Sequence, residues 1–156
     1  MSRRRFGHLD ARPPGPADEA FLEALYLDVR PDLGALPVPR GVIEGIARHQ
    51  RQLQLADYAQ RYPLCETWLV LDEGRPVARV VLDRANGVLR VVDLSVASAA
   101  RRRGVARAVL RALQEEGMAV ALRVRAENAP ARALYDKLGF TLQRANAATL
   151  ELGWSE

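Results

Sequence analysis

The spacing of hydrophobic residues divides the chain into a helical first part and a strand-rich second part. A short apolar stretch at 5–14 predicts one strand, which the proline pair at its end would terminate. Apolar residues three and four positions apart then predict a helix over 16–30 and a second helix over about 39–62. The second helix is long, and a break near Arg51 is an alternative.

The second part of the chain combines strands with two helices. Apolar runs predict strands over 66–71, 75–82, 88–97, 119–126, 140–145 and 148–154. Gly74 and the Asn86-Gly87 pair mark hairpin turns between the first three of these strands. Helices are predicted over 105–116 and 129–138, each ended by a glycine. The order is strand, two helices, three strands, helix, strand, helix and two strands, which indicates a mixed α/β (α+β) layered fold.

Length and composition favour one domain spanning residues 1–156. Hydrophobic residues make up 49% of the 156 residues, enough for a buried core. The single cysteine, Cys65, excludes an internal disulfide, and no His or Cys cluster has metal-ligand spacing, so no metal is expected. The basic start lacks a following apolar segment, and no run approaches about 18 apolar residues, so neither a secretory signal nor a membrane partner is expected. Together these features predict a cytoplasmic protein.

Arginine supplies almost all of the positive charge. The 23 lysines and arginines outnumber the 19 aspartates and glutamates, which gives a net charge of +4, and Lys137 is the only lysine. Such a balance suggests an anionic partner, although a solvated basic surface has the same composition. Aromatic residues make up only 6%, and no helix-turn-helix, RRM or zinc-finger pattern is present. A nucleic-acid partner is therefore disfavoured relative to a phosphate-bearing ligand.

The section 97–110 has the chemistry of an anion site. It joins a predicted strand to a predicted helix through three consecutive arginines, 101–103. Backbone N–H groups and the dipole at such a helix start favour a bound phosphate. Gly104 allows the backbone to approach an anion closely, and Ala106 is small. The sequence contains neither a P-loop motif nor a GxGxxG fingerprint, which excludes those two classes of nucleotide site.

Two motifs in this region resemble those of the GCN5-related N-acetyltransferase (GNAT) superfamily. The acetyl-CoA motif Gln/Arg-x-x-Gly-x-Gly/Ala is matched by Arg101, Arg102, Arg103, Gly104, Val105 and Ala106. After the next strand, the pattern N-x-x-A-x-x-L-Y-x-K-x-G-F is matched at Asn128, Ala131, Leu134, Tyr135, Lys137, Gly139 and Phe140. The first motif alone is weak, but the second, at the expected spacing, makes the resemblance specific. It covers about residues 66–144, and the remainder matches by element order.

The resemblance implies a GNAT-like fold and acetyl-CoA as co-substrate, without a metal. The fold would have a central mixed sheet of six to seven strands, splayed between the fourth and fifth, with about four flanking helices. Backbone N–H groups of 102–106 would hold the CoA pyrophosphate, with Arg101 at the first position of the motif. Leu94 and Val96 would pair through their backbones with the pantetheine arm, and Asn128 would hydrogen-bond the arm from the other side.

The resemblance also implies an N-acetyltransferase in which a primary amine attacks the thioester directly within a ternary complex. Tyr135 would act as the general acid beside the CoA sulfur. Asp93, in the middle of an apolar strand, is a candidate base, and a structural hydrogen bond or ion pair is the alternative for it. Glu66 is a weaker candidate base, and water or backbone groups could serve instead. No motif supports a ping-pong route through Cys65.

The sequence leaves the acceptor open. A small-molecule amine, a peptide N-terminus and an antibiotic are all compatible with it. We expect the long second helix and the loop at 31–39 to wall the acceptor site. A CoA-binding module without catalysis is the first alternative function, and a basic nucleic-acid-binding protein is the second. A homodimer is compatible with the sequence.

Overall fold

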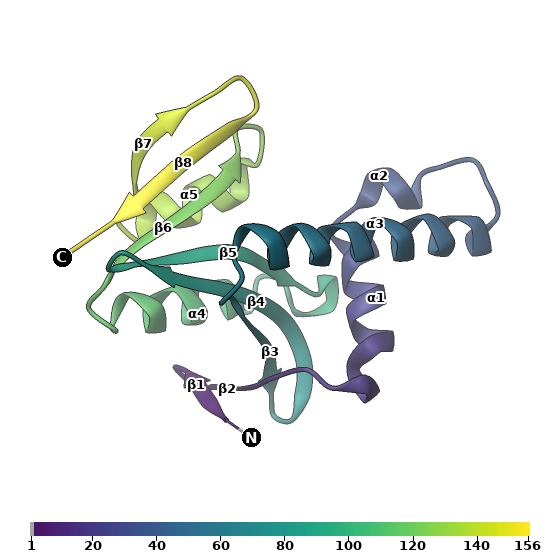
Figure 1. Cartoon of the computed structure of the whole chain (residues 1–156), viewed down its shortest axis with the longest axis horizontal. Coiled ribbons are helices and arrows are strands. Elements are labelled where there is room, and N and C mark those ends of the chain that lie inside the picture. The colour runs from purple at the N-terminus through teal and green to yellow at the C-terminus, as the bar shows by residue number, and fades with distance from the viewer. Residues whose placement is uncertain (1) are drawn as a thin grey trace.

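An eight-stranded sheet forms the centre of the molecule in this computed structural model, which describes residues 2–156. The strands are Arg4–Phe6 (β1), Leu9–Arg12 (β2), Glu66–Asp72 (β3), Arg75–Ala85 (β4), Val88–Val96 (β5), Ala119–Arg125 (β6), Thr141–Ala145 (β7) and Thr149–Trp154 (β8). They lie in the order β1-β2-β3-β4-β5-β6-β8-β7, and only β5 and β6 pair in parallel among the described strands. The helices are Glu19–Asp28 (α1), Pro31–Gly34 (α2), Arg40–Arg61 (α3), Val105–Gln114 (α4) and Ala129–Lys137 (α5) (Figure 1).

Helices cover both faces of the sheet. Helix α4 packs against β1, β2, β5 and β6, and α1 packs against β4 and β5 (Figure 1). The main hydrophobic core lies between α4 and the sheet, and its fully buried leucines are Leu9, Leu82, Leu89, Leu110, Leu113 and Leu122. A smaller cluster joins α1, α2 and α3 through Tyr26, Leu33, Ile43 and Ala47. Burying a large apolar side chain contributes about 1.5–3 kcal/mol to the free energy of unfolding. The core between α4 and the sheet holds most of these side chains and is therefore the main source of stability.

The fold class predicted from the resemblance is confirmed, but the sheet has eight strands where six to seven were expected. The additional strand arises because the predicted first strand is a hairpin. Its turn contains Gly7, whose φ of +63° is the left-handed conformation that glycine adopts without a Cβ penalty. Phe6 and Leu9 therefore face each other across the turn, and both are fully buried.

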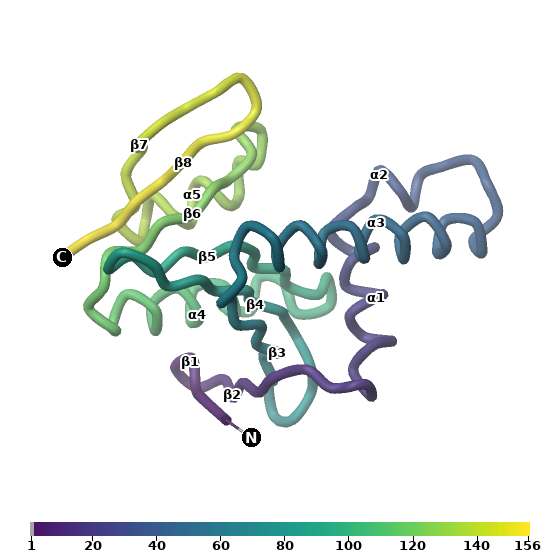
Figure 2. The backbone as a smooth tube through the Cα atoms, viewed as in Figure 1, coloured from purple at the N-terminus to yellow at the C-terminus, as the bar shows by residue number. Residues whose placement is uncertain are grey.

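The helices differ from the expectation in two places. The loop predicted between the first two helices contains the single turn α2, because Pro31 occupies its first position and sets a helical φ. Helix α3 is continuous, so the alternative of a break near Arg51 is wrong. The charge of the buried Arg51 is neutralised by an ion pair, because Arg51 Nη1 lies 2.7 Å from Glu19 Oε2 of α1. The N-terminal half of α3 extends past α1, away from the sheet (Figure 2).

A buried ion pair fixes the entry into α1. The Asp18 carboxylate accepts hydrogen bonds from both terminal nitrogens of Arg12, at 2.7 and 2.9 Å, and from the Gly15 N–H at 2.7 Å. The Asp18 side chain is only 8% exposed. The hydrogen bonds from Arg12 and Gly15 favour the charged form and lower the pKa of Asp18 to about 2.

We expect Asp18→Asn to lower the free energy of unfolding by about 2 kcal/mol at pH 7. The folded pKa of Asp18 lies below its unfolded value of about 3.9, so this stabilisation is complete above pH 5 and disappears as the pH falls towards 2. Urea titrations of both proteins from pH 7 to pH 2.5 would measure the difference. Asp10→Asn is the control, because Asp10 is 59% exposed and lies 3.7 Å from Arg5. Equal losses for the two variants would contradict the prediction.

A bulge in β5 changes which side chains face each side of the sheet. Leu82 pairs with Val91 and Val81 pairs with Asp93, so Val92 has no partner in β4. Since side chains alternate along a strand, one extra residue reverses the alternation beyond it. Leu89 and Val91 face the α4 core before the bulge, and residues 94 and 96 face it afterwards. Residues 93 and 95 consequently face α1 and α3.

Strands β5 and β6 separate beyond the bulge. Their parallel pairing runs from Val88↔Ala119 to Val91↔Leu122 and stops there, although β5 continues to Val96 and β6 to Arg125. This is the splay expected between the fourth and fifth predicted strands. It leaves one edge of each strand without a backbone partner near its carboxyl end.

Candidate active site

The start of α4 presents a row of free backbone donors. The N–H groups of residues 102–106 donate to no acceptor within residues 2–156. Gly104 caps the helix with φ of +76°, and Arg102 has φ of +65°, so the chain turns twice through the left-handed region just before α4. A Cβ at Gly104 would meet no atom within 4 Å, so open space lies in front of it. This geometry suits a phosphate or pyrophosphate.

The three arginines before α4 have different roles. The guanidinium of Arg101 donates to the carbonyl oxygens of Val96, at 3.2 Å, and Asp28, at 3.1 Å. It therefore ties the loop to β5 and to the end of α1. Arg102 and Arg103 are exposed and form no ion pair with any residue in 2–156. The guanidinium groups of Arg102 and Arg103, the two arginines expected to lie best for meeting phosphates, are thus left free beside the N–H row.

At the other end of α4, an acidic residue is held by two arginines. Glu116 accepts hydrogen bonds from Arg4 and Arg84, each at 2.7 Å. Burial alone would raise the pKa of Glu116, but these hydrogen bonds outweigh it and lower the pKa. The cation of Arg4 also lies over the rings of Phe6 and Trp68. This network joins β1, β3, β4 and the end of α4, so it holds the helix against the sheet.

The free edge of β5 carries backbone groups of the two predicted pantetheine residues. The Ala97 N–H donates to Val77 O of β4 at 2.8 Å. Since backbone groups of alternate residues point to opposite edges of a strand, those of Leu94 and Val96 point away from β4, towards the gap in front of β6. Across that gap, Asn128 begins α5 and accepts a hydrogen bond from the Ala131 N–H at 3.3 Å. Its side-chain N–H₂ group has no acceptor within residues 2–156 and can donate.

Tyr135 lies on α5 and is half-buried. Its ring packs edge-to-face on Phe140, with 5.7 Å between the ring centroids. Its hydroxyl has no hydrogen-bond partner within the described chain. Burial, and secondarily the charge of Asp93, raise the pKa of Tyr135. The hydroxyl therefore keeps its proton at neutral pH and is available as a donor.

Asp93 forms the ion pair that was the alternative to a base. Its Oδ2 accepts from Arg79 Nη2 at 2.8 Å and from Ser95 Oγ at 2.9 Å. Arg79 also donates to Gln54 Oε1 of α3 at 3.3 Å. Its Oδ2 atom is thus occupied by a guanidinium and a hydroxyl donor from the protein itself. This arrangement favours a role for Asp93 in fixing charge and geometry.

Two further sequence candidates lie elsewhere. Glu66 accepts hydrogen bonds from Arg84 at 2.6 Å and from Trp68 Nε1 at 3.1 Å, on the face of the sheet that packs against α4. Asp93 lies on the opposite face. Cys65 precedes β3, and burial, with a smaller contribution from Asp83, raises the pKa of its thiol. A thiol that stays protonated at neutral pH is a poor nucleophile.

Tyr58 of α3 is a residue whose importance the sequence did not indicate. Its place in the apolar stripe of a long helix is typical of packing. Burial, and then the charge of Asp93, raise the pKa of Tyr58. The charge of Asp93 thus contributes to the raised pKa of both Tyr58 and Tyr135. No motif marks Tyr58, because its relation to Asp93 depends on how α3 lies across the sheet.

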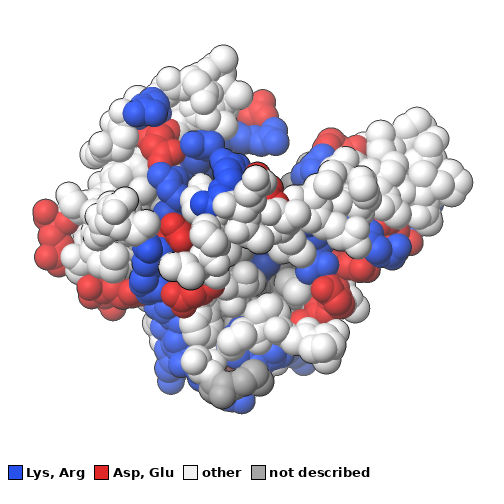
Figure 3. Space-filling model, in the orientation of Figure 1, with Lys and Arg blue, Asp and Glu red and all other residues white. Residues whose placement is uncertain are grey.

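A cavity of about 160 Å³ lies between α1, α3 and strands β4, β5 and β6. We call it the acceptor cavity, because the substrate amine is proposed below to bind there. Leu22, Leu25 and Val29 form its apolar wall, and its polar lining consists of Tyr26, Arg30, Gln54, Arg79, Asp93, Ser95 and Arg125. It spans the mouth of the splay, because residues 93 and 95 belong to β5 and residue 125 to β6. In Figure 3, basic side chains gather beside the hollow between the C-terminal strands and α3. Helix α3 contributes Gln54 to this lining, and the loop at 31–39 contributes no residue.

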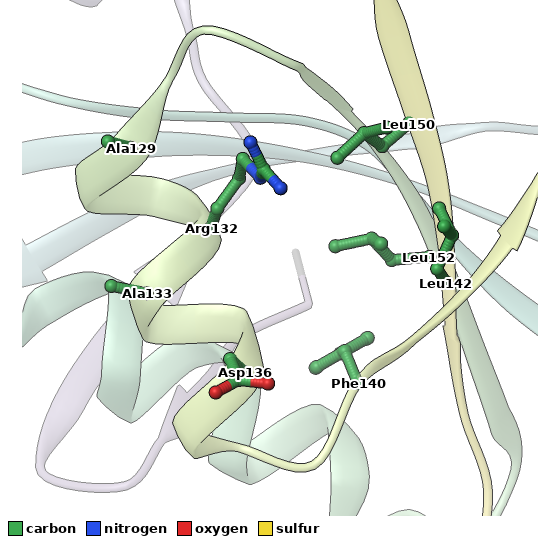
Figure 4. Close-up of a pocket in the computed structure, with 8 residues that line it drawn as sticks. All are labelled: Ala129, Arg132, Ala133, Asp136, Phe140, Leu142, Leu150 and Leu152. Carbon is green, nitrogen blue, oxygen red and sulfur yellow. The ribbon is translucent and has the colours of Figure 1, made fainter. Parts of the chain in front are cut away.

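A second cavity, of about 400 Å³, lies between α5 and the β7–β8 hairpin. Figure 4 shows Phe140, Leu142, Leu150 and Leu152 on its strand side, facing Ala129, Arg132, Ala133 and Asp136 on α5. The small side chains of Ala129 and Ala133 leave this space unfilled. None of the predicted catalytic or CoA-binding residues lines it.

Two features of the described chain bear on the expected partners. Within residues 2–156, no three His, Cys, Asp or Glu side chains come together as metal ligands. No helix in that part of the chain has the length and apolar character needed to cross a membrane.

Comparison with known proteins connects this geometry to a family. The model of the acetyltransferase (GNAT) family matches residues 22–140. A comparison with curated proteins finds no match.

Solved structures of similar fold include the PaiA N-acetyltransferase of Thermoplasma acidophilum in complex with coenzyme A, with 13% identity, TM-score 0.67 and coverage of 95% of this chain and 99% of that one. The RimL ribosomal L7/L12 α-N-protein acetyltransferase, also with coenzyme A, has 14% identity, TM-score 0.69 and coverages of 99% and 98%. The ribosomal-protein-S18-alanine N-acetyltransferase of Escherichia coli has 21% identity, TM-score 0.62 and coverage of 95% of each chain. The chain therefore belongs to the acetyltransferase (GNAT) family and is an N-acetyltransferase.

Proposed function

We propose that the chain transfers the acetyl group of acetyl-CoA to a primary amine of a small molecule or peptide, by direct attack within a ternary complex. The observation that carries the proposal is the row of free N–H groups at 102–106, at the end of a strand whose edge is also free. The pyrophosphate of acetyl-CoA suits the row of N–H groups, and its amide-bearing pantetheine arm suits the unpaired edge of β5. The two structural neighbours that contain coenzyme A support this choice of co-substrate.

The protein groups available to acetyl-CoA lie on both sides of the splay. The backbones of Leu94 and Val96 would pair with the pantetheine amides, and the Asn128 N–H₂ group would donate from the α5 side. The N–H groups of 102–106 would hold the pyrophosphate, with Arg102 and Arg103 beside it. In this pose the thioester would reach the acceptor cavity near Asp93 and Tyr135.

The transfer step needs two proton movements. The amine attacks as its free base, so a C–N bond forms while the C–S bond breaks. We assign the amine proton to solvent water, because Asp93 Oδ2 already accepts hydrogen bonds from Arg79 and Ser95. The leaving thiolate takes the proton of the Tyr135 hydroxyl, which solvent then replaces. Holding amine and thioester together within the cavity supplies the remaining rate enhancement.

The two alternative functions make different demands on the site. A CoA-binding module without catalysis would not need a tyrosine on α5 whose raised pKa keeps its hydroxyl protonated. A nucleic-acid-binding protein would need exposed cations along an extended surface, whereas most arginines here have carboxylate partners, among them Arg4, Arg12, Arg51, Arg79, Arg84 and Arg90. Both observations favour the enzyme. The cytoplasmic location stays a prediction from the single unpaired cysteine.

Acetyl-CoA should bind the purified protein and stabilise it against heat, and an amine panel should release CoA thiol. Because Arg102 and Arg103 are exposed beside the proposed phosphate site, the thermal shift should be larger at low salt than at high salt. Calorimetry and thermal unfolding with acetyl-CoA at two salt concentrations, with ligand-free buffer as the blank, would measure both effects. The absence of heat and of any thermal shift would overturn the proposal. A salt-independent shift would assign the phosphate to the backbone N–H groups alone.

A further inference from the structure

The acceptor cavity has an excess of positive charge. Three arginines line it against one aspartate. Arg79 and Asp93 neutralise each other at 2.8 Å, and Arg30 is held by both oxygens of Asp32, at 3.0 and 2.9 Å. Arg125 is different, because its nearest carboxylate, on Glu127, lies at 3.7 Å and both side chains are largely exposed. One guanidinium at the rim is therefore free to bind an anion.

The guanidinium on the floor of the cavity is committed to the protein. The Arg79 side chain is only 7% exposed, and its Nη2 donates to Asp93 Oδ2 and to Gln54 Oε1. Arg79 therefore adds positive charge to the cavity, while Arg125 supplies the free guanidinium. The one acidic group among the described lining residues, Asp93, is already occupied by Arg79 and Ser95.

The cavity also limits the size and the charge of its occupant. About 160 Å³ between the leucines of α1 and the sheet suits a small molecule. An acceptor with a second ammonium group would lie among three guanidinium groups with no free carboxylate in the described lining to compensate. A carboxylate on the acceptor would instead form a charge-assisted hydrogen bond with the free guanidinium of Arg125.

We propose, on the basis of the acetyl transfer proposed above, that the acceptor is a small primary amine that carries a carboxylate at the other end of a short chain, that is, an ω-amino acid. Arg125 binds the carboxylate at the rim of the cavity. The amine lies deeper in the cavity, towards Asp93 and Ser95 at the mouth of the splay, where it meets the thioester. Arg79 positions Asp93 and contributes positive charge to the floor.

Matched acceptors of equal chain length test this assignment. Initial rates of CoA-thiol release at saturating acetyl-CoA are compared for 4-aminobutyrate, 4-aminobutyramide and 1,4-diaminobutane, and for the corresponding three-carbon set. A charge-assisted hydrogen bond to the carboxylate should raise kcat/KM by about ten- to a hundredfold over the amide. The diamine should be the poorest acceptor of each set.

Arg125→Gln should remove this preference by raising KM for the carboxylate acceptors, with little change for the amides. Arg123→Gln is the matched control, because Arg123 lies two residues earlier on β6, is 57% exposed and does not line the cavity. The preference should survive in the control. Faster acetylation of the amide or the diamine, or a preference unchanged in Arg125→Gln, would overturn the inference and leave the proposed function intact.

The remaining outcomes separate the two proposals. Acetyl-CoA binding without turnover of any member of the panel also counts against the carboxylate assignment, because these acceptors span both chain lengths and all three charges. Failure of acetyl-CoA itself to bind would overturn the proposed function instead. Calorimetry with acetyl-CoA alone, on the wild type and on both variants, distinguishes these cases.

Discussion

Tyr135→Phe is expected to lower kcat by about 10²–10⁴-fold while acetyl-CoA still binds. The substitution removes only the hydroxyl, so the packing of the ring against Phe140 is kept. The thiolate would then leave without a proton donor. Stopped assays of CoA-thiol release give kcat, and calorimetry gives the affinity for acetyl-CoA.

The control for this variant is Tyr62→Phe. Tyr62 directly follows α3, its ring lies against Arg61, and it belongs to neither of the two acetyl-CoA motifs. Its kcat should equal that of the wild type. Because the pKa of Tyr135 is raised above its ordinary value of 10.0, wild-type activity should not decline below pH 10 through loss of this proton. Unchanged turnover in Tyr135→Phe with normal acetyl-CoA binding would remove the hydroxyl from the mechanism.

Gly104→Asp should weaken acetyl-CoA binding by about a hundredfold or more, since like charges brought together cost several kcal/mol. The new carboxylate would project into the open space in front of the N–H row, where the pyrophosphate is proposed to lie. The left-handed backbone at Gly104 adds a second cost, of about 1–2 kcal/mol in the free energy of unfolding.

Gly87→Asp separates these two costs. Gly87 lies in the turn between β4 and β5 and has the same φ of +76° as Gly104, and a Cβ there would likewise meet no atom within 4 Å. Both variants should lose similar stability in urea, but only Gly104→Asp should lose the affinity. A similar affinity in the two variants would mean that the start of α4 is not the phosphate site.

Local backbone chemistry was the part of the molecule that the sequence predicted well. The loop before α4 and the cap of α5 at Asn128 are encoded by consecutive residues, so their motifs carry the geometry with them. The splay between β5 and β6 and the mixed fold followed from the resemblance and are confirmed. The roles proposed for Tyr135 and for the CoA-binding residues stay predictions until the variants above are measured.

Contacts between distant segments were not predictable in the same way. Arg101 binds carbonyl oxygens at residues 28 and 96, so its role depends on where α1 ends in space. Asp93 was left between two roles because its partner, Arg79, lies on another strand. The hairpin at Gly7 was missed because its two strands are so short that they resemble one.

The bulge at Val92 makes the acceptor cavity depend on the number of residues in β5 as well as on their kinds. In a chain one residue shorter at this point, the carboxylate of Asp93 and the hydroxyl of Ser95 would turn towards the leucines of α4, and Arg79 would lose its partner. A substitution at Val92 would leave the number of residues in β5 unchanged. Among relatives that share this cavity, variation at this position should therefore consist of substitutions and not of insertions or deletions.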